Sequence, residues 1–343
     1  MRHSRTTPVL AGLAATALLL SGCAAAGGGA AGEDTAQGTL RVVASTNVYG
    51  DVARSIGGDR VEVTSIIDRM AQDPHSYEAS ARDKLAVSKA DLVLENGGGY
   101  DTFMHTLADD TGVDHNNIIT AVDLSPLPGA QDGAHTAAST DTDDGGAGQD
   151  AGHDGHSHGQ DDHAGHDHGG FNEHVWYDLA TMAQVADAIA GKLSALDPDQ
   201  ADTYKANAEQ FHAGLDKLGA EADEVAGSAD GAAVAATDPV PLHLFDALGL
   251  ENKTPEDFME AAEEGNDAAP QALKAAEDLV TGGSVRFLAY NEQTEGPQTQ
   301  RLRLLAEKAG IAVVNFTETL PEGQDYLGWM SGNLHAVEKA LRG

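Results

Sequence analysis

The chain has 343 residues, of which 55 are acidic and 20 basic, so its formal net charge is −35 with histidine neutral. This excess of anionic side chains repels phosphate backbones and excludes a DNA- or RNA-binding protein. Apolar residues make up 41% of the chain, enough for a folded core, and the length suits two domains. The single cysteine, Cys23, excludes an intrachain disulfide and a cysteine-based zinc site, whereas the 15 histidines are unevenly distributed.

The N-terminus has the features of a processing segment. A basic start precedes an apolar run from Val9 to Leu20, which is too short to span a bilayer but suits the core of a signal peptide. The run ends in the sequence LSGC, which resembles a bacterial lipobox. We therefore expect a signal peptide at 1–22, lipidation of Cys23 and an Ala/Gly-rich tether at 23–38. The alternative is an ordinary signal peptide with a chance cysteine.

From residue 39 on, short apolar runs rich in β-branched residues alternate with helical patterns. Several runs are apolar at successive positions, as in strands that are covered on both faces. This pattern predicts an α/β fold with parallel sheets. The expected strands are Leu40–Ala44, Val61–Ile67, Asp91–Glu95, Ile118–Val122, Ala232–Thr237, Arg286–Asn291 and Ile311–Thr317.

Two helical patterns divide these strands into two groups. Apolar residues spaced alternately four and three positions apart form one stripe on a long helix over 197–227, and a shorter helix over Leu179–Leu196 precedes it. A helix of this length can pass from one domain to the next. We therefore expect an N-terminal α/β lobe at 39–129, continued at 171–196, and a C-terminal α/β lobe at 228–343.

Residues 130–170 differ in composition from the rest of the chain. They include nine aspartates, seven histidines and no lysine or arginine, so we expect a disordered insertion. Histidines two or three positions apart can chelate a metal even in a mobile chain. So dense a cluster favours weak metal gathering over an acidic linker with an incidental histidine bias. The histidines concerned are His153, His156, His158, His163, His166 and His168, with His135 upstream.

Four polar motifs follow predicted strands or the histidine-rich insertion. Residues 72–78 (QDPHSYE) follow the strand Val61–Ile67, and residues 172–178 (NEHVWYD) follow the insertion. In the second lobe, residues 236–241 (ATDPVP) and 290–296 (YNEQTEG) end two strands. Open α/β sheets bind ligands at the carboxyl ends of their strands, and imidazole with carboxylate suits zinc, manganese or iron(II). One loop histidine alone would be explained as well by hydrogen bonding, so the prediction of a metal site rests on the joint pattern.

Two of these motifs carry a family resemblance. DPHSYE at 73–78 and EHVWYD at 173–178 resemble the two ligand motifs of the metal-binding substrate-binding lipoproteins that feed bacterial ABC importers for zinc and manganese. The histidine-rich insertion before the second motif is typical of the zinc-directed members. The resemblance covers the chain from about Leu40 to the C-terminus, together with the lipobox. It implies two α/β lobes joined by a long rigid helix, with a metal held in the cleft between them.

The resemblance also implies two histidine ligands, His75 and His174, which match the histidines of the two motifs. The third ligand of the family is a histidine or a carboxylate after the first strand of the second lobe. Asp238 stands at that place in this chain, and His243, five residues further on, is the less favoured choice.

The fourth ligand of the family, where present, is an acid in the loop that holds residues 291–295. The spacing here is not a clean match. We choose Glu295 over Glu292, with water as the other possible occupant of that position.

The ligand types leave the metal open between two ions. Two imidazoles with one or two carboxylates suit manganese or a broader selectivity, whereas the histidine-rich insertion favours zinc. Neutral imidazoles bind zinc more tightly along the divalent series, so we expect Zn²⁺ as the transported ligand, with Mn²⁺ as the alternative. The resemblance implies an ABC permease and its ATPase as partners, and a lipid-anchored protein on the extracytoplasmic face of the cell membrane. We expect a monomer.

Two other classes of protein compete with this interpretation. An extracytoplasmic metallohydrolase would need a general base beside an open metal position, typically in a motif such as HExxH, which the sequence lacks. A surface adhesin or metal buffer would bind metal without a permease, and the sequence leaves it open as an added role. We therefore expect a binding protein and not an enzyme.

Overall fold

The structure is a computed structural model that describes residues 38–130 and 171–343. The expected signal peptide, lipidated Cys23 and tether lie outside the described residues, except for the last position of the tether. The histidine-rich insertion lies outside them too, apart from its first residue. Within the described residues, no helix combines the length and the apolar character that crossing a membrane requires.

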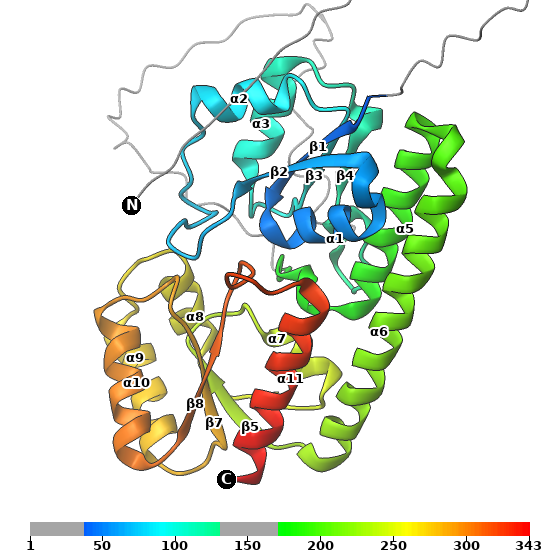
Figure 1. Cartoon of the computed structure of the whole chain (residues 1–343). Helices are drawn as coiled ribbons and strands as arrows, with labels where there is room; N and C mark the ends of the chain where they lie inside the picture. Colours follow the sequence, from blue (N-terminus) through cyan, green and yellow to red (C-terminus); the bar gives the residue numbers. More distant parts are fainter. Residues whose placement is uncertain (1–37, 131–170) are drawn as a thin grey trace, which may run out of the picture. The chain divides into compact units, whose positions relative to one another are not determined.

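The N-terminal lobe is built on a parallel sheet with the strand order β2-β1-β3-β4. Its helices lie between successive strands in the sequence, as right-handed crossovers of parallel strands require (Figure 1). The elements are β1 Leu40–Thr46, α1 Asn47–Gly57, β2 Val61–Ile67, α2 Ala81–Val87, β3 Leu92–Glu95, α3 Thr102–Thr111 and β4 Ile118–Thr120.

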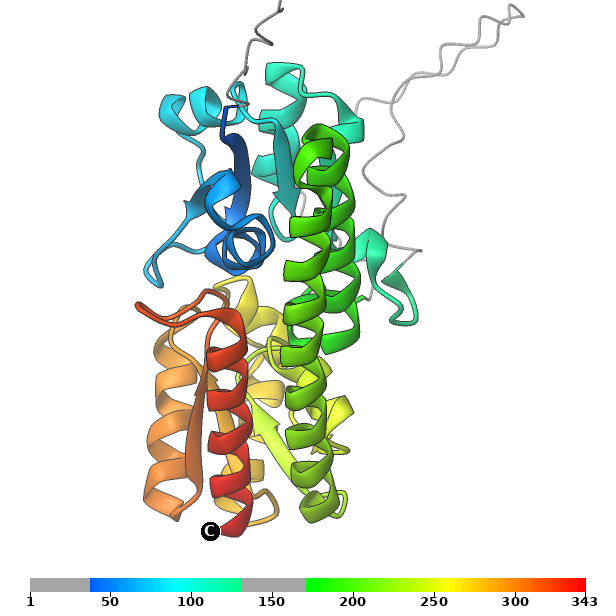
Figure 2. The ribbon, with the colours of Figure 1, turned by 45° about the vertical axis from the view of Figure 1, so that its right-hand side comes forward.

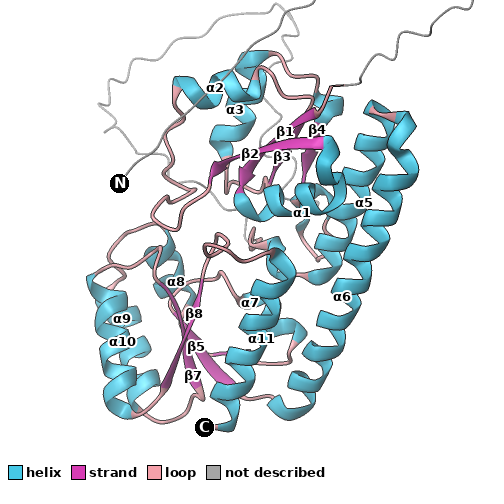
Figure 3. Ribbon diagram, viewed as in Figure 1, coloured by secondary structure: helices cyan, strands magenta, loops and turns pink. Residues whose placement is uncertain are grey.

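The C-terminal lobe repeats this topology, with the parallel strand order β6-β5-β7-β8. Helices alternate with the strands here as well (Figure 3). The elements are β5 Ala233–Ala236, α7 Leu242–Ala247, β6 Glu251–Asn252, α8 Glu256–Glu263, α9 Pro270–Thr281, β7 Phe287–Asn291, α10 Pro297–Ala309, β8 Ala312–Phe316 and α11 Tyr326–Arg342.

Two long helices follow the N-terminal sheet: α5 (Leu179–Leu196) packs on the N-terminal lobe, and α6 (Ala201–Ala229) connects the lobes. The 29 residues of α6 give a length of about 43 Å, and the helix runs beside both lobes (Figure 2). Its buried positions form the stripe expected from the sequence, from Tyr204 to Val225. The expected α/β fold with two parallel sheets and a long joining helix is therefore confirmed.

Most elements lie within one or two residues of their predicted bounds, and β2 and α5 match them fully. The predicted long helix begins later than expected, because Pro198–Gln200 forms a 3₁₀ turn before α6. Such tight turns are common at helix N-termini. The sequence analysis missed β6, which has only two residues, one of them exposed.

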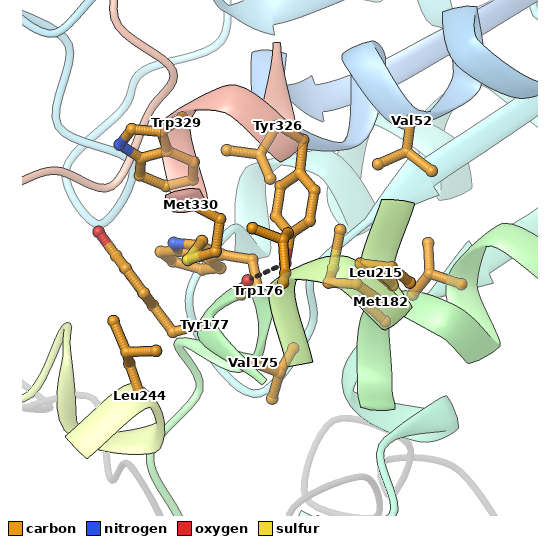
Figure 4. Close-up of a cluster of buried hydrophobic side chains, with 14 of the residues drawn as sticks. Val52, Val175, Trp176, Tyr177, Met182, Leu215, Leu244, Tyr326, Trp329 and Met330 are labelled. Atoms are coloured by element: carbon orange, nitrogen blue, oxygen red, sulfur yellow. Dashed lines mark hydrogen bonds between the residues drawn. The ribbon is translucent and has the colours of Figure 1, made fainter. Parts of the chain in front are cut away.

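One hydrophobic cluster contains residues of both lobes and of the helices between them. Figure 4 shows its centre, where Trp176 and Tyr177 from the N-terminal lobe lie against Trp329 and Met330 of α11. The rings of Tyr177 and Trp329 are 5.3 Å apart. The Tyr326 hydroxyl donates a hydrogen bond to the Trp176 carbonyl oxygen at 2.8 Å. Because close-packed interiors deform little, this shared core holds the lobes in a defined relative position.

Candidate metal centre

The carboxyl ends of the two sheets meet at the junction of the lobes. Asn47, directly after β1, is joined to Leu320, in the segment after β8, by two hydrogen bonds. The Asn47 amide nitrogen donates to the Leu320 carbonyl oxygen at 3.0 Å, and the Leu320 backbone nitrogen donates to Asn47 Oδ1 at 2.9 Å. Loops that follow strands in either lobe can therefore supply side chains to one common site, as expected for open α/β sheets.

His75 lies in the loop that follows β2. The carboxylate of Asp73 shapes this loop, because it accepts a hydrogen bond from the His75 backbone nitrogen at 3.0 Å and from the Ser76 hydroxyl at 2.6 Å. Such an Asx turn fixes a short loop without regular secondary structure. The imidazole meets the Tyr100 ring edge-on, with the centroids 5.0 Å apart, and is 13% exposed. The ring is therefore held at the junction with one face near solvent.

His174 is fully buried, and its hydrogen bonds fix its tautomer. Its Nδ1 lies 2.7 Å from Asn172 Oδ1. An amide oxygen can only accept, so Nδ1 donates to it, and in the neutral imidazole Nε2 is then the nitrogen that has the lone pair. The amide nitrogen of Asn172 in turn donates to the Pro239 carbonyl oxygen of the C-terminal lobe at 2.9 Å. A partner of this kind orients a metal-binding histidine in many proteins.

The residues directly after His174 anchor it to the shared core. Val175, Trp176 and Tyr177 form a short 3₁₀ turn, and all three are buried (Figure 4). The Tyr177 hydroxyl donates to the Thr317 carbonyl oxygen at 2.8 Å, across the junction. This bond ties the segment that carries His174 to the segment that carries Glu318.

Glu318 is buried at 1% exposure and is held by two neighbours. Asn291 Nδ2 donates to its Oε1 at 2.8 Å, and the Tyr100 hydroxyl donates to its Oε2 at 3.3 Å. Asp238, after β5, is equally buried and accepts a hydrogen bond from the Thr294 hydroxyl at 2.7 Å. Both carboxylates are therefore oriented by neutral donors.

Two overlapping groups of side chains in the described residues have ligand atoms within 4.8 Å of one another. The first is His75, His174 and Glu318; the second is His75, Glu173 and Glu263. Imidazole nitrogens and carboxylate oxygens are the ligands of zinc, manganese and iron(II) sites. The arrangement can therefore hold a divalent transition-metal ion.

The charge balance of this region also favours a cation. Burial raises the pKa of Asp238 to about 6, and burial together with the charge of Asp238 raises the pKa of Glu318 to about 8. Burial, followed by the charge of Glu173, raises the pKa of Glu263 to about 10. Among the described residues, no lysine or arginine forms an ion pair with Asp238, Glu263 or Glu318. Buried carboxylates without a compensating cation are costly, and a bound metal ion would remove that cost.

The structure brings together His75 and His174 but not all of the expected carboxylates. Asp238 lies close enough to be the charged group with the largest effect on the pKa of Glu318, although it belongs to neither group of three. His243 does not join them, because its Nε2 lies 2.8 Å from the Asn172 carbonyl oxygen. That contact agrees with ranking His243 below Asp238.

Glu295, the expected fourth ligand, lies apart from the two histidines in this structure. It is exposed, and its carboxylate accepts hydrogen bonds from the Tyr290 hydroxyl and from Gln300. The other choice, Glu292, is also exposed and accepts a hydrogen bond from Asn315. Both side chains belong to the surface of the C-terminal lobe. Glu318 takes the place next to the histidines instead.

Glu318 carries a sequence signal of the same kind as the four motifs. Glu318 follows the predicted strand Ile311–Thr317, so the rule that polar residues after strands reach the site applies to it as well. Glu263 had no such signal, because it is the last residue of a helix. Nothing in the local sequence relates it to the motifs that contain His75 and His174.

The remaining described histidines lie away from this site. His105 lies 3.4 Å from Glu95 Oε1, and His115 lies 3.4 Å from Asp109 Oδ1. His212 Nε2 lies 2.8 Å from Asp187 Oδ1 on the surface. These contacts are ordinary hydrogen bonds and ion pairs with nearby acids.

The fold and the site together define a class of protein. Two α/β lobes share a core and are joined by the long helix α6, and they place two imidazoles and several buried carboxylates at their junction. This is the organisation of a two-lobed binding protein whose ligand is a small cation.

Comparison with known proteins gives the family. Residues 42–340 match the family model described as "ZnuA: Zinc-uptake complex component A periplasmic", and the chain belongs to this family. The manganese-binding lipoprotein MntA of Halalkalibacterium halodurans is 28% identical over 203 residues, which cover 59% of this chain and 54% of MntA. The iron ABC transporter substrate-binding lipoprotein MtsA of Streptococcus pyogenes serotype M1 is 26% identical over 212 residues, which cover 60% of this chain and 56% of MtsA. The matches thus span little more than half the length of these curated relatives.

Solved structures share the fold at low sequence identity. The periplasmic zinc binding protein TroA from Treponema pallidum has a TM-score of 0.64 and 18% identity, with 89% of this chain and 99% of TroA covered. A manganese-bound periplasmic metal binding protein from Candidatus Liberibacter asiaticus has a TM-score of 0.61 and 17% identity, with 88% of this chain and 99% of that protein covered. These likenesses extend over both lobes.

Proposed function

We propose that this protein captures a divalent transition-metal ion, zinc in preference to manganese, and delivers it to an ABC-type permease. The observation that carries the proposal is the convergence of His75, His174 and Glu318, with ligand atoms within 4.8 Å of one another at the lobe junction. The family, described as a component of a zinc-uptake complex, supports transport as the purpose of binding. Capture and delivery need no catalytic step, so we propose no enzymatic activity.

The preference for zinc rests on the two imidazoles. His174 presents an oriented neutral nitrogen, and neutral imidazole binds zinc more tightly than manganese along the divalent series. The number of buried carboxylates favours manganese instead, which is the metal that MntA is named for. Manganese is therefore the alternative ligand.

Competition between the two metals tests the preference. Protein purified without added metal and titrated by calorimetry should bind one tight equivalent of zinc and release manganese when zinc is added. A variant lacking residues 131–170 should keep this tight equivalent and lose additional weak ones, as expected for a metal-gathering insertion. Displacement of zinc by equimolar manganese would contradict the preference. Loss of the tight equivalent in the variant would contradict the separate role of the insertion.

We propose His75, His174, Glu318 and Asp238 as the ligands of the tight site. Asp238 is supported by its burial, by its place after β5 and by its effect on the pKa of Glu318. The structure offers His243 as a matched test, because it lies in the same segment and its Nε2 is placed 2.8 Å from the Asn172 carbonyl oxygen.

We expect Asp238→Asn to lower zinc affinity by at least about 10-fold to 100-fold. Loss of a group that only supports a metal ligand already costs this much, and loss of a ligand should cost no less. His243→Gln should change it less than Asp238→Asn does. Chelator competition on both purified variants measures the difference, and thermal unfolding checks that both are folded. If His243→Gln has the larger effect, then His243 supplies the third ligand and the assignment of Asp238 is wrong.

We propose the ABC permease and its ATPase as partners, and the extracytoplasmic face of the cell membrane as the location. Relatives such as MntA and MtsA are named as lipoproteins, and the lipobox-like sequence around Cys23 supports the same anchor here. We propose a monomer, since one chain supplies every ligand of the proposed site.

Growth of a strain that lacks this protein separates import from metal buffering or hydrolysis. Under metal limitation the strain should grow poorly, and added zinc or the intact gene should restore growth. Rescue by the intact gene but not by zinc or manganese would contradict an import role.

A further inference from the structure

Glu263 lies between the two histidines but belongs to neither of their motifs. It is the last residue of α8, a helix fixed in the C-terminal lobe by the buried side chains of Phe258, Met259 and Ala262. Its own side chain is only 8% exposed. The Oε1 atom of Glu263 lies 3.3 Å from His174 Nε2 and 3.9 Å from His75 Nε2.

These distances fit atoms that share one metal ion. Zinc binds nitrogen at about 2.0–2.1 Å and oxygen at about 2.0–2.2 Å, so two ligands at a tetrahedral angle stand about 3.3–3.5 Å apart. The separation of Glu263 Oε1 from His174 Nε2 falls in this range, and its separation from His75 Nε2 exceeds it by about half an ångström. A small side-chain movement would bring all three atoms into contact with one ion.

The two imidazoles are the cationic partners that the described residues offer Glu263, and they are cationic only when protonated. The Oε1 atom of Glu263 accepts no hydrogen bond from the described residues, and no lysine or arginine among them pairs with it. Its charged neighbours are Glu173, Asp238, Glu318 and Glu264, all of the same sign. A carboxylate in such a place destabilises the protein unless a cation shares it.

We propose that Glu263 is a direct ligand of the bound cation, supplied by the end of α8 in addition to the histidines and carboxylates that follow strands. The inference rests on the proposed function, since it concerns the same metal ion. A further carboxylate adds a hard oxygen ligand to the site and allows a higher coordination number, and both properties suit manganese. Glu263 therefore contributes more to the binding of manganese than to the binding of zinc.

The test compares Glu263→Gln with Glu264→Gln in the full mature chain. Glu264 is the adjacent residue and is exposed, so it controls for the loss of one negative charge near the site. We expect Glu263→Gln to lower manganese affinity by about 10-fold to 100-fold and zinc affinity by less, while Glu264→Gln changes either by less than about 2-fold. Affinities are measured by chelator competition with Mn²⁺ and Zn²⁺, on variants whose thermal unfolding matches that of the wild type.

The outcomes distinguish this inference from the proposed function. Unchanged affinity of Glu263→Gln for both metals, with affinity lost in His174→Ala, would show that Glu263 is no ligand although the site is real. Tighter binding by Glu263→Gln would show that Glu263 competes with the metal and would also overturn the inference. Failure of the wild-type protein to bind either metal would contradict the proposed function itself.

Discussion

Replacing His174 by alanine should lower zinc affinity by more than about 100-fold, since the loss of a supporting group alone costs about 10-fold to 100-fold. His174 is fully buried and its Nδ1 is bound by Asn172, so Nε2 is already oriented for the metal. His75→Ala should have a similar effect. In the wild-type protein, Nε2 of His75 is the ring nitrogen that lies 3.9 Å from Glu263 Oε1, at the same junction.

The matched control is His212→Ala, because His212 contacts Asp187 on the surface, away from the site. It should bind zinc like the wild type. Chelator competition gives the affinities, and circular dichroism shows whether each variant keeps the fold. Wild-type affinity in either His75→Ala or His174→Ala would remove that histidine from the ligand set.

Glu318→Gln should weaken zinc binding by about 10-fold to 100-fold, whereas Glu295→Gln should leave it within about 2-fold of the wild type. Glu318 is buried beside the histidines, and glutamine keeps its size and its ability to accept from Asn291 while removing the charge. Glu295 is exposed and bound to Tyr290 and Gln300.

This pair tests the proposal that Glu318, and not Glu295, is a ligand. Both variants carry the same chemical change in the same lobe, so a general effect of charge would weaken them alike. Isothermal titration with zinc measures both. A larger loss in Glu295→Gln than in Glu318→Gln would restore Glu295 as the ligand and would mean that the loop after β7 rearranges on binding.

The sequence predicted the architecture well because the central strands β1, β3, β5 and β7 are buried along most of their length. Runs such as Phe287–Asn291 are marked by apolar and aromatic residues, and the edge strand Val61–Ile67 is marked by its β-branched residues. The strand β6 escaped prediction because two residues carry no periodicity, and its place in the sheet depends on pairing with β5. Short pairings of this kind depend on tertiary contacts, which local sequence does not encode.

The candidate site was only partly predictable, for a related reason. His75 and His174 stand in compact motifs, so their types and neighbours were enough to single them out. Glu318 and Glu263 reach the same place through β8 and α8, and only the packed lobes bring them there. The choice between Glu295 and Glu292 stays a prediction, and in this structure both side chains bind other partners on the surface.

We propose that one metal ion binds at the lobe junction, between ligands of both lobes. Anomalous diffraction at the zinc edge from crystals of the zinc-loaded mature protein locates this ion. We expect one strong peak about 2.0–2.2 Å from His75 Nε2, His174 Nε2 and a Glu318 oxygen. Strong peaks confined to surface histidines such as His105 or His212, with none at the junction, would contradict it.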